Sequence, residues 1–479
     1  MKFFRLKFLE ITGVFLVVCL GFLLRAYMYQ YIPFSGEPDE LYSVWNGLSL
    51  IEDGVPSSWS GLSAYEEKDI IFFGQIGGGS WENGAFRMYT IVRPWFDHFP
   101  MFSLIVGGNA KLFNMEKLKV LPTGIIRLPM LFFGLVSLVL IYLVTKKLFN
   151  RDVAFVSLLF FATSPIIVFS SRMVVLENLL VIFELILINF VYEFLKTNKR
   201  KFLYLIYLMV FLSLQLKATG IFFVLAVGVL FLFEKKKREV VNLMLVSLLS
   251  VLTILGYGFY YDGSLFFRVM KVLTTKEVGF ATIAKMFSTP TVATTGFFDG
   301  WFYFGFISMW LVIFSEKLKK EKGMVIIISF FITWIAGLFL TSARTDNMGW
   351  YWLPLYPLMA ISGGRLVVDF IKEKSFYGLI FCFIFLLTGF YIVKIPVSGE
   401  FLKAIVGVGI LIAFVSVYFK KKFSGLIKVA FVIILATMVF ANSLAVINYY
   451  TRMCENDECN IPIKSDVKIK IPGWREVSL

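Results

Sequence analysis

Two adjacent acids follow the first long apolar run of the chain. They are Asp39 and Glu40, within the segment Ser35-Gly36-Glu37-Pro38-Asp39-Glu40-Leu41-Tyr42. Ionised carboxylates are costly to desolvate beside a bilayer, so acids placed there indicate chemistry or ligand binding. Pro38 suits the first turn of a helix, where an acid is stabilised by the helix dipole. Asp39 is therefore either a charge that stabilises a helix start or an ionised general base.

Further charged residues lie where other apolar runs are expected to reach the same side. They are Arg127, Arg172, Glu177, Lys217, Arg344 and Asp346. Lys217 opposes the usual preference of basic residues for cytoplasmic loops. It either extends to the membrane interface or holds an anionic phosphate as a point charge, and the same two interpretations apply to Arg344. The neighbouring Trp350, Tyr351 and Trp352 form either an interfacial aromatic belt or part of a ligand site.

His98 is the only histidine. It is either an ordinary surface or core residue, or a contact to a metal or an acceptor. With no second histidine, a metal site would need carboxylates, and the sequence leaves a divalent metal possible. Cys19 and Cys382 lie in apolar runs and are predicted to be packing residues. Cys454 and Cys459, in the polar tail, form either a small disulfide loop or two free thiols.

Composition and charge distribution define the class of protein. The chain has 479 residues, 58% of them apolar, and a net charge of +15. Apolar runs of about 20 residues separated by basic patches predict a polytopic helical membrane protein. The basic patches fall in alternate short loops, which fits the positive-inside rule and argues against nucleic-acid binding. The sequence has no Walker-type phosphate loop, which argues against ATP-driven transport by this chain alone.

From the lengths of the apolar runs we expect about thirteen membrane spans. Their predicted limits are 9–30, 124–145, 152–170, 175–195, 202–216, 219–233, 240–260, 297–315, 323–341, 351–370, 376–394, 401–419 and 425–447. Ile11 to Leu24 resembles a signal peptide, but no cleavage site of the Ala-x-Ala type follows, so we interpret it as a retained span.

Sidedness follows from the basic patches. They place the N-terminus in the cytoplasm, and an odd number of spans then places the tail, residues 448–479, on the outer side of the plasma membrane. Residues 1–447 form one predicted transmembrane domain. Two large outer loops interrupt it, residues 31–123 and residues 261–296. The second loop mixes aromatic and basic residues, which predicts a helix lying on the membrane surface.

Taken together, these residues resemble the polytopic GT-C glycosyltransferases, above all the branch of protein O-mannosyltransferases and lipid A aminoarabinose transferases. The segments that carry the resemblance are Pro38 to Tyr42, Asp97 to Met101, Ile126 to Pro129, Phe133-Gly134, Ser164-Pro165, Lys217 to Gly220 and Leu353 to Pro357. Phe99 replaces the first proline of the family's His-Pro-Pro-Leu segment. The Trp-Trp-Asp-Tyr-Gly signature of oligosaccharyltransferases is absent, which argues against transfer of a whole glycan to asparagine.

The resemblance implies an all-α GT-C fold and an inverting transferase with its active site on the outer face. The donor would be a polyprenyl- or dolichyl-phosphate sugar, and the acceptor a hydroxyl of a lipid, glycan or protein. Carried over residue by residue, it makes Asp39 the general base and Glu40 its support or a substrate-orienting group. It assigns donor-phosphate binding to Lys217, Arg344 and Arg172, and we expect substrate contacts from His98, Arg127, Glu177, Trp350 and Tyr351.

Two other functions stay open at this point. A lipid or sugar transporter or flippase would place charges deep within the spans and open a pathway to both faces. The charges here gather instead at the expected outer ends of the spans. A noncatalytic subunit of a membrane assembly would tolerate loss of Asp39. The sequence identifies neither the sugar nor the acceptor.

Overall fold

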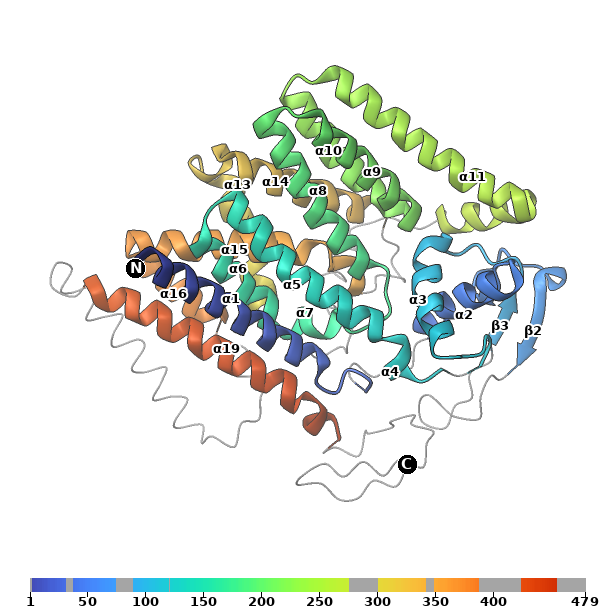
Figure 1. Ribbon diagram of the computed structural model, residues 1–479, viewed down its shortest axis with the longest axis horizontal. Coiled ribbons are helices and arrows are strands. Elements are labelled where there is room, and N and C mark those ends of the chain that lie inside the picture. Colours follow the sequence, from blue (N-terminus) through green and yellow to red (C-terminus); the bar gives the residue numbers. More distant parts are fainter. Residues whose placement is uncertain are drawn as a thin grey trace.

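The computed structural model describes residues 2–31, 38–74, 89–119, 121–274, 300–341, 349–386 and 424–454. Most of these residues are helical, and the long helices run side by side in one bundle (Figure 1). A smaller lobe, residues 38–74 and 89–119, lies at one end of the bundle (Figure 1). The predicted all-α architecture with a large first loop is thus confirmed, with the addition of a short sheet in that loop.

The helices of the bundle are α1 (Lys2–Ala26), α4 (Thr123–Ile126), α5 (Leu128–Leu148), α6 (Arg151–Thr163), α7 (Pro165–Ser170), α8 (Glu177–Thr197), α9 (Arg200–Leu216), α10 (Ile221–Phe233), α11 (Lys237–Thr274), α13 (Gly300–Phe314), α14 (Lys322–Thr341), α15 (Leu355–Glu373), α16 (Phe376–Leu386) and α19 (Ser424–Cys454). The predicted span 401–419 lies outside the described residues. Five stretches of the described part are long and apolar enough to cross a membrane: Thr123–Leu148, Glu177–Thr197, Lys237–Thr274, Lys322–Leu340 and Gly425–Ile447. The count of thirteen spans stays a prediction.

The predicted span 152–170 is broken in the structure. Helix α6 ends at Thr163, Ser164 is extended (φ −62°, ψ 120°), and α7 begins at Pro165. A proline has no N–H to continue the ladder of the preceding helix, and its ring disfavours helical backbone at the residue before it. The span is therefore two helices, and α7 leads into a buried turn, residues 171–176.

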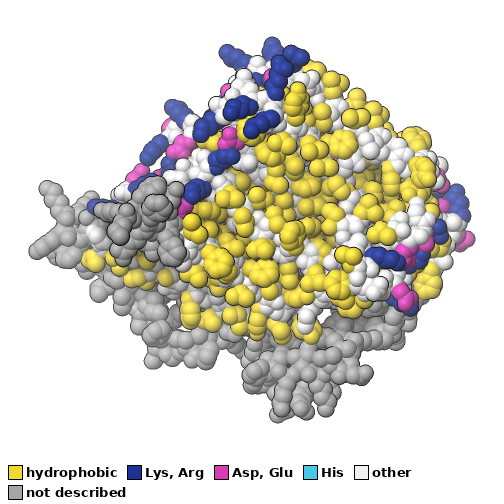
Figure 2. Space-filling view, viewed as in Figure 1, with side chains coloured by type: hydrophobic (Ala, Val, Ile, Leu, Met, Phe, Trp, Pro, Cys, Tyr) yellow, Lys and Arg dark blue, Asp and Glu magenta, His cyan; other side chains and the backbone are white. Residues whose placement is uncertain are grey.

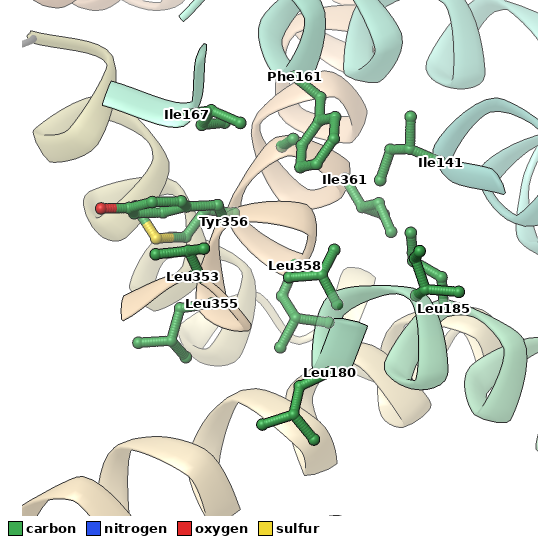
Figure 3. Close-up of a cluster of buried hydrophobic side chains, with 14 of the residues drawn as sticks. Ile141, Phe161, Ile167, Leu180, Leu185, Leu353, Leu355, Tyr356, Leu358 and Ile361 are labelled. Carbon is green, nitrogen blue, oxygen red and sulfur yellow. The ribbon is translucent and has the colours of Figure 1, made fainter. Parts of the chain in front are cut away.

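The centre of the bundle is a packed apolar core. Ile141 of α5, Phe161 of α6, Leu185 of α8 and the pair Leu358 and Ile361 of α15 are buried and point toward one another (Figure 3). The outer surface differs from that of a water-soluble protein, because apolar side chains cover the middle of the face shown in Figure 2. Lys and Arg side chains gather most densely along the upper-left edge of that face, and a smaller group mixed with acids lies at the right edge (Figure 2). An apolar belt with a basic edge is typical of a multi-pass membrane protein, as predicted.

The lobe combines two helices with a small antiparallel sheet. Its helices are α2 (Pro38–Asp53) and α3 (Pro100–Leu112), and the sheet has the order β1-β3-β2, formed by Ser58–Trp59, Tyr89–Val92 and Ile70–Gly74. Helix α2 packs closely on α3 because two glycines face each other. A Cβ added at Gly47 would overlap the backbone of Ser103, and one added at Gly107 would overlap the backbone of Gly47. This contact fixes the helix that begins with the predicted acids.

The partly buried carboxylate of Asp97 links the loops of the lobe. Asp97 accepts hydrogen bonds from Ser60 Oγ (2.6 Å) and Tyr65 Oη (2.8 Å), and Tyr65 Oη in turn accepts from the Phe96 N–H (2.8 Å). Burial, reinforced by the charge of Asp97, raises the pKa of the Tyr65 hydroxyl well above its ordinary value. The Tyr65 hydroxyl therefore stays protonated and donates to Asp97, and this hydrogen bond links two loops of the lobe.

Helix α11 changes direction at Asp262, whose backbone is extended (φ −164°, ψ 99°). The Asp262 carboxylate then accepts from the Leu265 N–H (2.9 Å) and restarts the helix. Beyond this kink, Phe266 packs edge-on against Phe96 of the lobe (5.4 Å between ring centroids), and Arg268 donates to Asp69 (3.0 Å). The predicted helix in the second loop therefore exists as far as Thr274 and docks on the lobe. Its location on a membrane surface stays a prediction, and residues 275–296 lie outside the described residues.

Candidate functional site

Glu40 is the centre of a closed, fully buried cluster. Its two carboxylate oxygens accept from Arg127 Nε (2.9 Å) and Arg127 Nη2 (2.7 Å), and neither side chain is exposed to solvent. The Val174 N–H donates to the same carboxylate (2.9 Å), and Arg127 Nη1 donates to Tyr29 O (2.7 Å). A bidentate pair of this kind fixes both partners in orientation as well as in distance. We call Glu40, Arg127, Val174 and Tyr29 the Glu40 cluster.

The buried turn between α7 and α8 has backbone N–H and C=O groups that are free to bond side chains, whereas in a continuous helix they would bond to each other. The Val174 N–H reaches Glu40 in this way, and Asn178 Nδ2 donates to Met173 O (2.9 Å) in the same turn. Irregular backbone is tolerated at membrane depth where protein groups satisfy it. The break at Pro165 therefore provides the turn that receives Glu40.

Arg172 lies in the same turn and is fully buried. Its guanidinium donates to Leu24 O at the C-terminal end of α1 and lies over the Phe169 ring, 5.1 Å from the centroid. The backbone carbonyls at a helix C-terminus carry partial negative charge, which stabilises a cation there. The structure thus gives Arg172 a contact with the end of α1, and its predicted contact with a donor phosphate stays a prediction.

Arg25 was not among the predicted site residues, yet it is fully buried in the same region. It donates to Gly21 O (2.9 Å), Ala162 O (3.1 Å) and Phe161 O (2.9 Å), and so joins the end of α1 to the end of α6. Gly134 of α5 makes room for it, because a Cβ there would lie 2.9 Å from Arg25 Cδ. The available sequence signal was a charged residue inside an apolar run.

Lys217 forms a second cluster with Glu177 and Tyr351. It follows the last residue of α9, where its extended backbone (φ −158°, ψ 146°) ends the helix. Its ammonium donates to Glu177 at the first position of α8 and lies 4.4 Å from the centroid of the Tyr351 ring. The Glu177 side chain is 2% exposed and that of Lys217 is 11% exposed. We call these three residues the Lys217 cluster.

The turn between α7 and α8 joins the two clusters. Val174 contacts Glu40, and Glu177, three residues later, contacts Lys217. Three residues span at most about 11 Å. Charged groups from α2, α4–α5, α8 and the α9–α10 connection therefore converge at one end of the bundle, the end that carries the lobe (Figure 1).

His98 lies in the lobe against α2. It is partly buried, with its ring 5.1 Å from that of Tyr42 and 5.9 Å from that of Trp95, between centroids. Tyr42 comes three residues after Asp39, about one turn along the same helix. The structure therefore brings His98 to the helix that carries the predicted acids.

Several of the remaining predicted residues lie partly or wholly outside the described part of the chain. Asp39 lies in the first turn of α2, but its side chain is outside the described residues. Arg344 and Asp346 fall in a segment outside them as well, as does Cys459. Trp350 is partly buried beside Tyr351, with 6.5 Å between ring centroids. In the part of the chain that the structure describes, no group of three His, Cys, Asp or Glu side chains could hold a metal ion.

Comparison with known proteins adds sequence and structural likenesses. Residues 97–257 match the family model of dolichyl-phosphate-mannose-protein mannosyltransferase. This segment contains Arg127, Arg172, Glu177 and Lys217 and begins after Asp39 and Glu40. No curated protein sequence matches the chain.

Among solved structures, the chain is similar to ArnT from Cupriavidus metallidurans, with 12% identity over 94% of this chain and 78% of ArnT. The TM-score is 0.54 for apo ArnT and 0.53 for ArnT bound to undecaprenyl phosphate. The chain shares the GT-C fold. It is also similar to the apo oligosaccharyltransferase from Archaeoglobus fulgidus, with 11% identity and a TM-score of 0.51 over 91% of this chain and 56% of that one. The predicted resemblance to GT-C glycosyltransferases is thus confirmed.

Proposed function

We propose that the chain is a membrane glycosyltransferase that moves a sugar from a polyprenyl- or dolichyl-phosphate donor to an acceptor hydroxyl. The GT-C fold and the family match of residues 97–257 support this class of enzyme. The observation that carries the proposal is the convergence of the Glu40 and Lys217 clusters on one short turn. It sets the start of α2, which bears Asp39, near a cation suited to a phosphate.

In the proposed reaction Asp39 is the general base. The acceptor oxygen attacks the anomeric carbon from the side opposite the phosphate, while Asp39 takes the hydroxyl proton. The bond from the anomeric carbon to the phosphate oxygen breaks, and its electron pair stays on that oxygen. The products are an inverted glycoside and a polyprenyl phosphate. A positioned base of this kind contributes roughly 10²- to 10⁴-fold to a rate.

Lys217 is the proposed cation for the departing phosphate, since a fixed positive charge stabilises the negative charge that develops as the bond breaks. Arg344 keeps the same proposed role, and its position lies outside the described residues. His98, Trp350 and Tyr351 are proposed to contact the sugar or the acceptor.

Arg127 and Arg172 take a different role in this proposal from the one expected from sequence. Both are fully buried, and their guanidinium groups are engaged by Glu40, Tyr29 O and Leu24 O. We propose that they hold the turn after α1 and the start of α2, and so position Asp39. Glu40 follows Asp39 directly in α2 and supports it, because the bonds of Glu40 to Arg127 and Val174 fix the start of this helix.

The denser gathering of Lys and Arg, at the upper-left edge in Figure 2, supports a topology with the N-terminus in the cytoplasm. The lobe and both clusters then face the extracytoplasmic side, and so does the C-terminal tail. A donor held by its lipid within the bilayer would reach this end of the bundle without a soluble nucleotide-binding domain.

The test is Asp39→Asn in membranes supplied with radiolabelled lipid-linked sugars. An amide cannot accept the proton, so transfer should fall by about 10²- to 10⁴-fold while expression is unchanged. Asp53→Asn is the matched control, because Asp53 ends the same helix and pairs with Lys117 at the surface. It should transfer at the wild-type rate.

Near-normal transfer by Asp39→Asn contradicts the base role. Absence of transfer by the wild-type chain from every lipid-linked sugar contradicts the enzyme class and favours a transporter. The residue to test in that case is Glu184, which is fully buried midway along α8. Its two carboxylate oxygens have no hydrogen-bond partner among the described residues.

A further inference from the structure

Glu177 is an acid placed directly against the cation proposed to hold the donor phosphate. It contacts the Lys217 ammonium and is 2% exposed, so water screens its charge only weakly. Its position is rigid, because it is the first residue of α8 and follows a turn whose residues are all buried. Any phosphate that binds Lys217 must therefore approach an acid that cannot move far away.

The donor and the product of the proposed reaction differ in charge. A lipid-linked sugar phosphate is a diester with one negative charge. The polyprenyl phosphate that remains after transfer is a monoester, which carries a charge of about −1.5 to −2 at neutral pH because its second pKa is about 6. The reaction thus increases the negative charge at the phosphate site by nearly one unit.

We infer that Glu177 determines the preference of this site for the donor over the product, and so promotes release of polyprenyl phosphate. This inference rests on the proposed function. An ammonium has three N–H donors, so Glu177 and a phosphate can share Lys217. Two oxygens that accept from one ammonium nitrogen lie about 4 to 5 Å apart, close enough for strong repulsion between the two anions.

The repulsion by Glu177 weakens binding of the monoester product more than binding of the diester donor. It acts on both ligands, but the additional charge of the monoester is opposed by Glu177 and is not matched by any change in Lys217. The pair Lys217–Glu177 is close to neutral as a unit, so it holds a monoanion through one hydrogen-bonding ammonium but offsets little of the larger desolvation cost of a dianion. Lys217 alone would prefer the dianion. Glu177 therefore removes most of the advantage that an isolated lysine would give the dianion.

The experiment compares two short-chain probes with the detergent-solubilised full chain. They are farnesyl phosphate, a monoester, and methyl farnesyl phosphate, a diester with the same lipid. Calorimetric titration at pH 8 gives the affinity of each. We expect the wild-type chain to prefer the diester. Glu177→Gln should raise the affinity for the monoester by about tenfold and leave that for the diester within about twofold.

Two further variants separate charge from structure. Glu177→Asp keeps the charge beside Lys217, so it should keep the wild-type preference and shows that the position tolerates substitution. Glu184→Gln removes a carboxyl group two turns further along the same helix and should change neither affinity.

Equal changes for the two probes, or no change, in Glu177→Gln overturn the role of Glu177 while leaving the phosphate site in place. Failure of both probes to bind the wild-type chain overturns the phosphate site itself and the inference with it. In turnover assays the corresponding result is stronger inhibition of Glu177→Gln by polyprenyl phosphate at an unchanged KM for the donor.

Discussion

The Glu40 cluster and the Lys217 cluster each contain an acid paired with a basic residue, and they differ in how completely the pair is shielded from solvent. In the Glu40 cluster the carboxylate accepts from three N–H groups, and neither ion is exposed. In the Lys217 cluster the ammonium contacts the Glu177 carboxylate and the Tyr351 ring, and the Lys217 side chain is 11% exposed. The first arrangement leaves no room for a ligand, whereas the second permits one.

The energetic reason is desolvation. Once two ions are buried and fully bonded, removing or diverting one partner leaves the other charged and unpaired, at a cost of about 3 to 5 kcal/mol. A closed cluster of this kind therefore favours a fixed geometry over exchange of partners. A partly exposed lysine can accept a new anion with a smaller penalty. This contrast supports a positioning role for Arg127 and a binding role for Lys217.

The largest expected effect follows from opening the closed cluster. Arg127→Met leaves the Glu40 carboxylate buried without its bidentate partner, so we expect a loss of about 3 to 5 kcal/mol in the free energy of unfolding. Thermal unfolding of the solubilised protein measures the loss. The double variant Glu40→Gln with Arg127→Met should recover part of it, since no charge is then unpaired. Wild-type stability of the single variant would show that the cluster is not closed.

A smaller effect on stability, together with weaker donor binding, is expected at Lys217. Lys217→Ala should raise the KM for the lipid-linked donor by roughly tenfold or more, because a hydrogen bond to a charged group contributes about 1.5 to 3 kcal/mol. The melting temperature should also fall, because the Glu177 carboxylate is 2% exposed and loses its ion-pair partner. Lys217→Arg keeps the charge and serves as the control, with a smaller rise in KM. A large loss of stability with an unchanged KM would place Lys217 with the structural residues.

Gly134→Ala tests the contact of α5 with Arg25. The new methyl group would lie 2.9 Å from Arg25 Cδ, and the guanidinium cannot move freely because three carbonyls hold it. Overpacking of this kind costs about 1 to 3 kcal/mol. Gly256→Ala in α11 is the matched control, since nothing lies within 4 Å of its added Cβ. Equal stability of the two variants would contradict a tight fit around Arg25.

The smallest effect concerns the docking of the α11 segment on the lobe. Lys68, and then Arg268, lower the pKa of the Glu66 carboxyl below its ordinary value. The ionised form is thus favoured in the folded state, so its contribution is present above the ordinary pKa of 4.5 and fades as the pH falls through the lowered one. The protection factors of residues 263–274 in hydrogen exchange should fall slightly in acid, and Glu66→Gln should remove most of that fall. Protection factors that do not change with pH would contradict the contribution of this pair.

The sequence predicted the bundle well because hydropathy and length decide which segments enter a bilayer. It missed the break in 152–170, since Ser164-Pro165 lies inside an apolar run where a kinked helix and two helices look alike. It also gave no strands in residues 31–123, because strands of two to five residues leave no clear alternation.

The site was harder to predict than the fold. Glu40 and Arg127 were both singled out, but not as partners, because 87 residues separate them and no local spacing links them. The Val174 N–H could not be found from side-chain types at all, since any residue supplies one. Lys217 and Glu177 were identified as charges on one face, whereas their direct contact depends on how α8 and α9 pack.

The link between Arg25 and the end of α6 has a consequence for biogenesis. Two of its acceptors, Phe161 O and Ala162 O, are encoded more than 130 residues after Arg25 itself. During synthesis these two acceptors are not yet present when the first helix is inserted. We expect the Arg25 guanidinium to extend toward the headgroups at that stage, where long basic side chains of membrane helices are hydrated. Arg25 can form its bonds to Phe161 O and Ala162 O only after α6 has been inserted. The final seating of the N-terminal helix is therefore a late event in assembly, although that helix is made first.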